Sequence, residues 1–415
     1  MDSRPRWNRS DEHLPSVFVF VSPAYGHVNP LLPLIQELVR IGYLVRVYTG
    51  GGMRERIEKT GAVCIDYDPW YEMGQSPEGD AYGFLRMLEL SGSMDEAVGN
   101  DARRFKPRFA IVDTESIWGR LLAEKHGLPV ALSSATQIMN LFTIAEDWLA
   151  FFKGLEPYED RISRMLERLT TKGFPKHTLL SLLIPGEHMN CVAYIPESLQ
   201  GQLETIDRSR VFFAGFSRDP GRRKDEGRAS MGAQALQGSM AVAKKGNRPL
   251  LYVTMGTVAG RTPWFFRSCI AALRNMDMDV IMAVWNEIDL DALGPLPDNI
   301  RAVREVDQAE VLKRADAALF HAGLNTVVDC LLLGVPMAVY PTLADQFANA
   351  KRVEETGTGI RITDHRPDTI RKAVSALLTD VSYRERAVAM GEHMRALGGG
   401  KKAAAWVVDR MDRED

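Results

Sequence analysis

A histidine and an aspartate each follow a short apolar run in the first half of the chain. His27 lies just after the run VFVFV at residues 17–21, and Asp113 ends the later run IVD. Parallel strands end at one edge of their sheet, so the two side chains are expected to share that edge. A neutral imidazole can take a proton from a hydroxyl group near neutral pH, and a carboxylate on its second ring nitrogen holds it in place. The pair predicts a general base, His27, oriented by Asp113.

Both residues also have a structural interpretation. A histidine at this position can cap the helix that Asn29 and Pro30 are expected to begin. An aspartate at a strand end often caps the next helix. The sequence alone leaves these alternatives open.

Polar residues also gather in a turn between an apolar run and a helix-like run in the second half of the chain. They are His321, Gly323, Asn325 and Thr326. Unpaired backbone amides and the positive end of the helix dipole at such a turn attract anions. Glycine lets a phosphate approach the backbone, and the side chains can donate hydrogen bonds to its oxygens. With Thr257 of an earlier turn closing the cradle, the pattern predicts a diphosphate site.

The second group belongs to a longer pattern. The residues from His321 onward read H-x-G-x-N-T-x-x-D, then G-V-P, then P-x-x-x-D-Q-x-x-N-A. This pattern resembles the donor-binding signature of the family-1 glycosyltransferases, which include bacterial antibiotic and macrolide enzymes and plant secondary-metabolite enzymes. The segment GHVNPLLPLIQELVRIGYLV and the segment FFAGF resemble further parts of that family, so the resemblance covers almost the whole chain. It implies the GT-B fold, with two Rossmann-like, doubly wound parallel-sheet domains facing a central cleft.

The resemblance also implies roles for individual residues. His27 and Asp113 would form the catalytic dyad. Asp329 would take the place of the ribose-binding Glu, and Asp345 with Gln346 would bind hydroxyl groups of the donor sugar. The residues implied to hold the diphosphate are His321, Gly323, Asn325, Thr326 and Thr257.

One segment departs from the family pattern. The family has W-x-P-Q where this chain has Glu305-Val306-Asp307-Gln308. The aromatic ring that stacks on the nucleotide base is therefore missing, and the sequence does not choose between a UDP-sugar and a TDP-sugar. Val306 and Gln308 are kept among the expected donor-binding residues, with Gln308 reaching the ribose.

The implied reaction is a single in-line displacement that inverts the anomeric carbon. A hexose would pass from a nucleotide diphosphate sugar to a hydroxyl group of a lipophilic small molecule, such as a macrolide or another secondary metabolite. Two alternatives remain from the sequence: an acceptor that is a membrane lipid or cell-envelope intermediate, and a catalytically silent protein that binds sugar nucleotides. Attack by nitrogen or carbon in place of oxygen is also left open, and so is the choice between a monomer and a homodimer.

These residues need two α/β domains to position them. Apolar runs alternate with helix-like runs in both halves of the 415-residue chain, which is long enough for two hydrophobic cores. The expected divisions are an acceptor-binding domain at 1–216, a linker at 217–248, a donor-binding domain at 249–400 and a helix at 401–415 that packs back toward the first domain. Aromatic residues between Trp70 and Phe174, including Trp148, Phe151 and Tyr158, are candidates for an apolar acceptor pocket.

Composition argues against several other classes of function. A net charge of -3 provides no broad positive field for a nucleic acid, and no apolar run is long enough to span a membrane. The isolated cysteines suit buried thiols in a cytoplasmic protein. Three unrelated D-x-D strings are interpreted as chance rather than as a metal site, so neither a metal nor another cofactor is expected. The D-x-D strings begin at Asp66, Asp277 and Asp289, and the cysteines are Cys64, Cys191, Cys269 and Cys330.

Overall fold

The computed structural model describes residues 14–68, 80–139, 155–184, 189–217, 248–256, 263–284, 288–304, 306–342 and 345–413. The chain forms two compact units. The N-terminal unit comprises Met1–Glu197, Gln202–Arg218 and Leu397–Asp415, and the C-terminal unit comprises Ser198–Gly201 and Asp219–Ala396. The expected linker, apart from its two terminal residues, lies outside the described residues, so its boundaries stay a prediction.

The N-terminal unit is built on a parallel sheet in which the strand order is β3-β2-β1-β4-β5-β6-β7. All residues of β1 and β4 are buried, which explains why both appear in the sequence as continuous apolar runs. The strands are β1 Ser16–Phe20, β2 Leu44–Thr49, β3 Val63–Asp66, β4 Phe109–Asp113, β5 Val130–Ser134, β6 Asn190–Ala193 and β7 Val211–Phe213. The helices are α1 Tyr25–Arg40, α2 Arg54–Glu58, α3 Asp80–Phe105, α4 Ile117–Lys125, α7 Glu159–Thr171, α8 Leu179–Leu183 and α17 Gly399–Asp412.

The C-terminal unit repeats this design in the strand order β10-β9-β8-β11-β12-β13, again with parallel pairing. The expectation of two doubly wound parallel sheets is therefore confirmed. The strands are β8 Leu250–Thr254, β9 Asp279–Ala283, β10 Ile300–Val303, β11 Ala317–Phe320, β12 Met337–Val339 and β13 Gly359–Arg361. The helices are α11 Pro263–Leu273, α12 Gln308–Leu312, α13 Leu324–Leu333, α14 Gln346–Glu355, α15 Pro367–Thr379 and α16 Ser382–Leu397.

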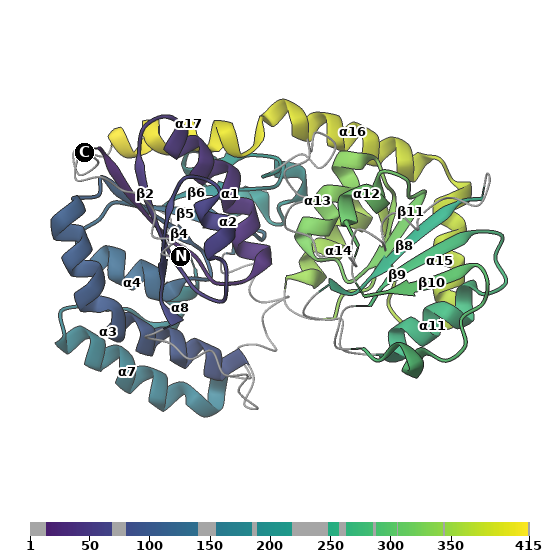
Figure 1. Cartoon of the computed structure of the whole chain (residues 1–415), viewed down its shortest axis with the longest axis horizontal. Helices are drawn as coiled ribbons and strands as arrows, with labels where there is room; N and C mark the ends of the chain where they lie inside the picture. Colours follow the sequence, from purple (N-terminus) through teal and green to yellow (C-terminus); the bar gives the residue numbers. More distant parts are fainter. Residues whose placement is uncertain are drawn as a thin grey trace, which may run out of the picture. The chain divides into compact units, whose positions relative to one another are not determined.

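The last helix belongs to the N-terminal unit. Figure 1 shows α17, in yellow, running alongside α1, and the two helices pack closely. Ala403, Ala404 and Val407 of α17 are fully buried in the same apolar core as Leu34 and Ile35 of α1. The end of the chain thereby covers the helix that follows β1.

Helix α1 begins one turn earlier than the sequence indicates. The expected start, with Asn29 as cap and Pro30 as first residue, is wrong, because the helix begins at Tyr25 and contains Pro30. Val28 is completely buried and continues the apolar face of α1 toward its N-terminus, so core packing outweighs the local preference for the start at Asn29. His27 consequently lies on the first turn of α1, and the helical backbone sets the direction in which its side chain leaves the helix.

Helix α4 crosses β1 at Gly119 with no room for a side chain. A Cβ atom added at Gly119 would lie 2.2 Å from Cβ of Phe20. Phe20 is itself fully buried and stacks on Tyr48, with ring centroids 4.8 Å apart. The approach of α4 to β1 therefore depends on glycine at this position.

We expect Gly119→Ala to lower the free energy of unfolding of the N-terminal unit by about 1–3 kcal/mol, because the added methyl group overpacks the contact with Phe20. Calorimetric unfolding of the full chain measures the change. Gly83→Ala is the matched control: Gly83 lies in α3 with no neighbour within 4 Å of an added Cβ atom, and alanine favours a helix. Equal stability of Gly119→Ala and the wild type would contradict the packing account.

Candidate functional site

Each sheet reverses its strand order at one point, and candidate residues follow the strands on both sides of that point. In the N-terminal unit, β1 and β4 are neighbours; His27 lies beyond the end of β1, and Asp113 ends β4. In the C-terminal unit, β8 and β11 are neighbours; Gly256 follows β8, and His321 follows β11. Open α/β sheets bind ligands at the carboxyl ends of strands where the order reverses. Both groups therefore stand at positions suited to ligand binding.

His27 and Asp113 are in direct contact, as the sequence predicts for their positions. The distance from His27 Nδ1 to Asp113 Oδ1 is 3.0 Å. The Asp113 side chain is only 1% exposed, and that of His27 is 14% exposed. Because a carboxylate accepts hydrogen bonds, Nδ1 carries the hydrogen and Nε2 is the nitrogen left for other partners.

The second oxygen of Asp113 is also held. Ser116 Oγ donates to Asp113 Oδ2 at 3.2 Å and lies 3.0 Å from Ser22 Oγ. Asp113 does not cap α4 through its side chain, because the cap residue is Ser116. The carboxylate is therefore fixed on both oxygens, which orients the imidazole ring.

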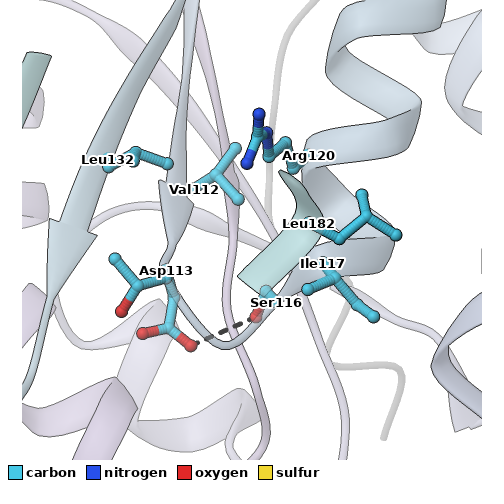
Figure 2. Close-up of a pocket in the computed structure, with 8 residues that line it drawn as sticks. Val112, Asp113, Ser116, Ile117, Arg120, Leu132 and Leu182 are labelled. Atoms are coloured by element: carbon cyan, nitrogen blue, oxygen red, sulfur yellow. Dashed lines mark hydrogen bonds between the residues drawn. The ribbon is translucent and has the colours of Figure 1, made fainter. Parts of the chain in front are cut away.

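Asp113 also lines a small pocket between β4, β5, α4 and α8. Figure 2 shows the Asp113 carboxylate at one end of this pocket and the Arg120 guanidinium at the other. Arg120 donates to Glu124 Oε1 at 2.8 Å and to the Ser181 carbonyl at 2.9 Å. Its charge is thus engaged elsewhere, so the cation available to Asp113 is His27.

Glu115 is a third member of the site that the sequence analysis missed. Its Oε2 atom lies 3.1 Å from His27 Nε2, and its side chain is 34% exposed. It stands in the turn between β4 and α4, two residues after Asp113. An acidic residue so close to a strand-end aspartate is the one signal in the sequence that points to this contact.

The two carboxylates control the protonation of His27. Burial alone would lower the pKa of the imidazole, but the charges and hydrogen bonds of Asp113 and Glu115 outweigh burial and raise the pKa well above its ordinary value. Burial would raise the pKa of Glu115, but the positive charge of His27 lowers it instead. The contacts with the two carboxylates therefore favour the protonated, imidazolium form of His27.

In the C-terminal unit, His321 is packed between two glycines. A Cβ atom added at Gly256 would lie 2.4 Å from Cε1 of the imidazole, and one added at Gly323 would lie 2.5 Å from Nε2. Gly256 also has φ +63°, a conformation that favours glycine. Gly323 precedes α13, whose first turn has no side-chain cap. The glycines let the imidazole and the uncapped helix start lie side by side.

The environment of His321 is opposite to that of His27. The residue His321 is 9% exposed, and Nδ1 has no hydrogen-bond partner among the described residues. Burial lowers the pKa of His321 to about 4, so the ring is neutral at pH 7. A neutral ring beside an uncapped helix start offers a hydrogen-bond donor to an anion without bringing a buried charge.

The turn before α13 is held in a strained conformation. Ala322 has φ +65°, which is uncommon for a residue with a side chain. Asn349 of α14 donates to the Ala322 carbonyl at 3.1 Å and is itself buried. Strain of this kind persists where surrounding contacts enforce it, and it is common at ligand sites.

The other predicted donor-binding residues lie near this turn in two groups. Gln308 Nε2 donates to Asp329 Oδ2 at 2.9 Å, which joins the start of α12 to α13. Asp345 Oδ2 accepts from Asn349 at 3.0 Å, and Gln346 Oε1 accepts from the backbone and hydroxyl of Thr342, both at 2.9 Å. Asn349 thus connects Asp345 to the turn at Ala322.

For three further predicted donor-binding residues, the structure gives the degree of exposure. Asn325 is exposed, Thr326 is buried, and Val306 is half-buried in the segment after β10. Thr257 and Glu305 lie outside the described residues, as do Trp148 and Phe151 of the expected acceptor pocket. The roles given to these residues stay predictions.

Two of the D-x-D strings engage their carboxylates in local contacts. Asp68 accepts from the Gly51 amide at 3.2 Å, and Asp289 accepts from the Asp291 amide at 3.1 Å at the start of a short helix. Asp277 of the third string pairs with Arg248 at 3.0 Å. Within the described ranges, no group of three or more His, Cys, Asp or Glu residues is arranged to hold a metal ion.

Two further observations concern the class of protein. All four cysteines are free and buried. No helix in the described part of the chain is long and apolar enough to cross a membrane. The cytoplasmic location stays a prediction.

Comparison with known proteins places the chain in a family. Residues 267–404 match the family described as erythromycin biosynthesis protein CIII-like, C-terminal domain. NDP-glycosyltransferase YjiC of Bacillus subtilis (strain 168) is 30% identical over 395 residues, covering 92% of this chain and 94% of that protein.

Solved structures support the same placement. The glycotransferase of kitacinnamycin has a TM-score of 0.77 at 24% identity, and CalG4, the calicheamicin glycosyltransferase, has a TM-score of 0.74 at 25% identity. Each comparison covers 96% of this chain and 98% of the other. The GT-B fold expected from the sequence is thereby confirmed.

We expect His27 and His321 to have pKa values on opposite sides of the ordinary histidine value of about 6.5. His27 should titrate well above it and His321 near 4. Asp113→Asn should lower the pKa of His27 and leave that of His321 unchanged. Histidine NMR titration measures both, with His27→Gln and His321→Gln spectra assigning the signals. A His27 pKa at or below the ordinary value in the wild type would contradict the paired-carboxylate account.

Proposed function

The chain belongs to the GT-B glycosyltransferase family that includes NDP-glycosyltransferase YjiC, and on this premise we propose that it transfers a hexose from a nucleotide diphosphate sugar to a hydroxyl group of a lipophilic small molecule. The proposed transfer inverts the anomeric carbon and needs no metal. The observation that carries it is the buried 3.0 Å contact between His27 and Asp113.

His27 would act as the general base. Its Nδ1 atom is committed to Asp113, so Nε2 would take the proton of the acceptor hydroxyl as the oxygen attacks the anomeric carbon. The oxygen–carbon bond forms while the bond from that carbon to the phosphate oxygen breaks, and its electron pair leaves with the nucleotide diphosphate. Contact with both carboxylates favours the protonated form of His27, so the Nε2 proton must pass to water before Nε2 can accept the proton of the hydroxyl group.

His321 and the start of α13 would hold the diphosphate. A neutral imidazole can donate one hydrogen bond to a phosphate oxygen, and the positive end of the α13 dipole, which no side chain caps, attracts the same anion. These donors would stabilise the negative charge that develops on the leaving group. The glycines at 256 and 323 support this role, because the lack of a side chain at both positions lets the imidazole lie against the backbone at the start of α13.

The remaining contacts suit the sugar and the ribose. The Gln308–Asp329 pair presents a carboxylate and an amide together, which suits the two hydroxyls of a ribose. Asp345 and Gln346 are proposed to bind hydroxyls of the transferred hexose, as the family resemblance implies. Whether the base is uracil or thymine depends on the segment at Glu305, so UDP and TDP both belong in a first binding test.

The acceptor class is proposed from the similar proteins. The structurally similar enzymes are named for kitacinnamycin and calicheamicin. A lipophilic secondary metabolite is therefore the proposed acceptor class for this chain.

We expect His27→Ala to reduce turnover by about 100-fold or more, because a positioned general base contributes roughly 100- to 10,000-fold. The affinity for the nucleotide diphosphate should remain near normal, since His27 belongs to the other unit. Product formation under donor saturation measures the first quantity, and calorimetric titration with UDP and TDP measures the second. Undiminished turnover in this variant would remove His27 from the mechanism.

We expect His321→Ala to weaken the binding of UDP or TDP by about 10- to 100-fold, the effect of losing one hydrogen bond to a charged group. Titration calorimetry or ligand-induced thermal shift provides the measurement. His393→Ala, which removes an exposed histidine of α16, is the matched control and should bind normally. If both variants bind the nucleotide as the wild type does, the diphosphate does not lie at His321.

A further inference from the structure

Glu115 occupies the only nitrogen of His27 that an acceptor can use. Nδ1 of the imidazole is held by the buried Asp113 at 3.0 Å, and Nε2 lies 3.1 Å from Glu115 Oε2. The proposed reaction requires the acceptor hydroxyl to reach Nε2. An acceptor must therefore take the place that the Glu115 carboxylate holds beside Nε2 in the structure.

Displacement would leave Glu115 without its cation. Within the described part of the chain, His27 is the only basic residue in an ion pair with Glu115. The side chain is 34% exposed, so water would replace part of the lost interaction but not all of it. An acceptor with a second hydrogen-bond donor beside its reacting hydroxyl would replace the remaining part of the interaction that Glu115 loses.

We propose that Glu115 is a specificity-determining residue that favours acceptors carrying a hydrogen-bond donor next to the hydroxyl group that receives the sugar. The inference rests on the proposed function, because it concerns the acceptor side of the same reaction. Vicinal diols, catechols and amino alcohols have the required arrangement. Their first hydroxyl would meet Nε2 while the neighbouring donor meets the Glu115 carboxylate.

The proton balance assigns Glu115 a binding role only. After the Nε2 proton of His27 has passed to water, the proton of the reacting hydroxyl passes to Nε2, and the neighbouring donor keeps its hydrogen while it is bonded to Glu115. Among the described residues, the charged groups that face the imidazole are Asp113 at the end of β4 and Glu115 in the turn after it. Both raise the pKa of His27, so removal of either should lower it.

A second histidine in the same unit provides a matched control. His126 Nε2 lies 3.1 Å from Asp95 Oδ1, the same distance as in the Glu115 contact. Asp95 also pairs with Lys125, so its charge does not depend on one imidazole. Asp95→Asn therefore removes a carboxylate from a histidine without touching the proposed site.

The experiment compares three acceptors that share one aromatic scaffold. The compounds differ only in their terminal group, which is 3,4-dihydroxyphenyl, 4-hydroxyphenyl or 4-hydroxy-3-methoxyphenyl. For each compound, the amounts of all glycosylated products are added together. We expect the wild type to favour the dihydroxy compound over each of the others by about tenfold in kcat/KM. The ratio should fall toward one in Glu115→Ala, take an intermediate value in Glu115→Gln and stay unchanged in Asp95→Asn.

Two outcomes would overturn the proposal. One is a wild type that does not distinguish the dihydroxy compound from the other two, and the other is a preference that survives in Glu115→Ala. A histidine NMR titration of Glu115→Gln adds a readout that needs no turnover: the pKa of His27 should fall, while Asp95→Asn leaves it unchanged. If no acceptor is glycosylated by any variant although His27 responds to Glu115→Gln, the proposed transferase activity fails while the contact itself is upheld.

Discussion

The buried carboxylate of Asp113 is the constraint on which the N-terminal site depends. A carboxylate with 1% exposure must find a cation or several hydrogen-bond donors within reach, because burying an uncompensated charge is costly. His27 and Ser116 meet that need, and they come from the start of α1 and the start of α4. The adjacency of β1 and β4 is what brings these segments to one carboxylate.

Each unit has a histidine after a strand at the point where its sheet reverses the strand order, but the two histidines lie in opposite electrostatic environments. His27 lies between two carboxylates that raise its pKa, whereas His321 lies between two glycines and burial lowers its pKa to about 4. A ring that gains and loses a proton suits acid–base chemistry. A ring that stays neutral suits hydrogen bonding to an anion that the adjoining helix already attracts. The same strand arrangement thus suits a proton-transfer site in one unit and an anion-binding site in the other.

The parts predictable from sequence are those set by strand burial. Continuous apolar runs identify β1, β4, β8 and β11, and the shared edge of parallel strands then predicts that His27 and Asp113 meet. The start of α1 was not predictable, because burial of Val28 overrides the cap at Asn29. The Glu115 contact depends on the geometry of one turn, and the Gln308–Asp329 pair depends on tertiary packing, so neither follows from local pattern.

A double-mutant cycle on turnover tests most directly whether His27 and Asp113 act as one catalytic unit. Turnover is measured for the wild type, His27→Ala, Asp113→Asn and the double variant under donor saturation. Residues that act as a unit are strongly non-additive, so the double variant should lose little more activity than His27→Ala alone. Losses that multiply independently would show that Asp113 does not act through His27, and would contradict the account.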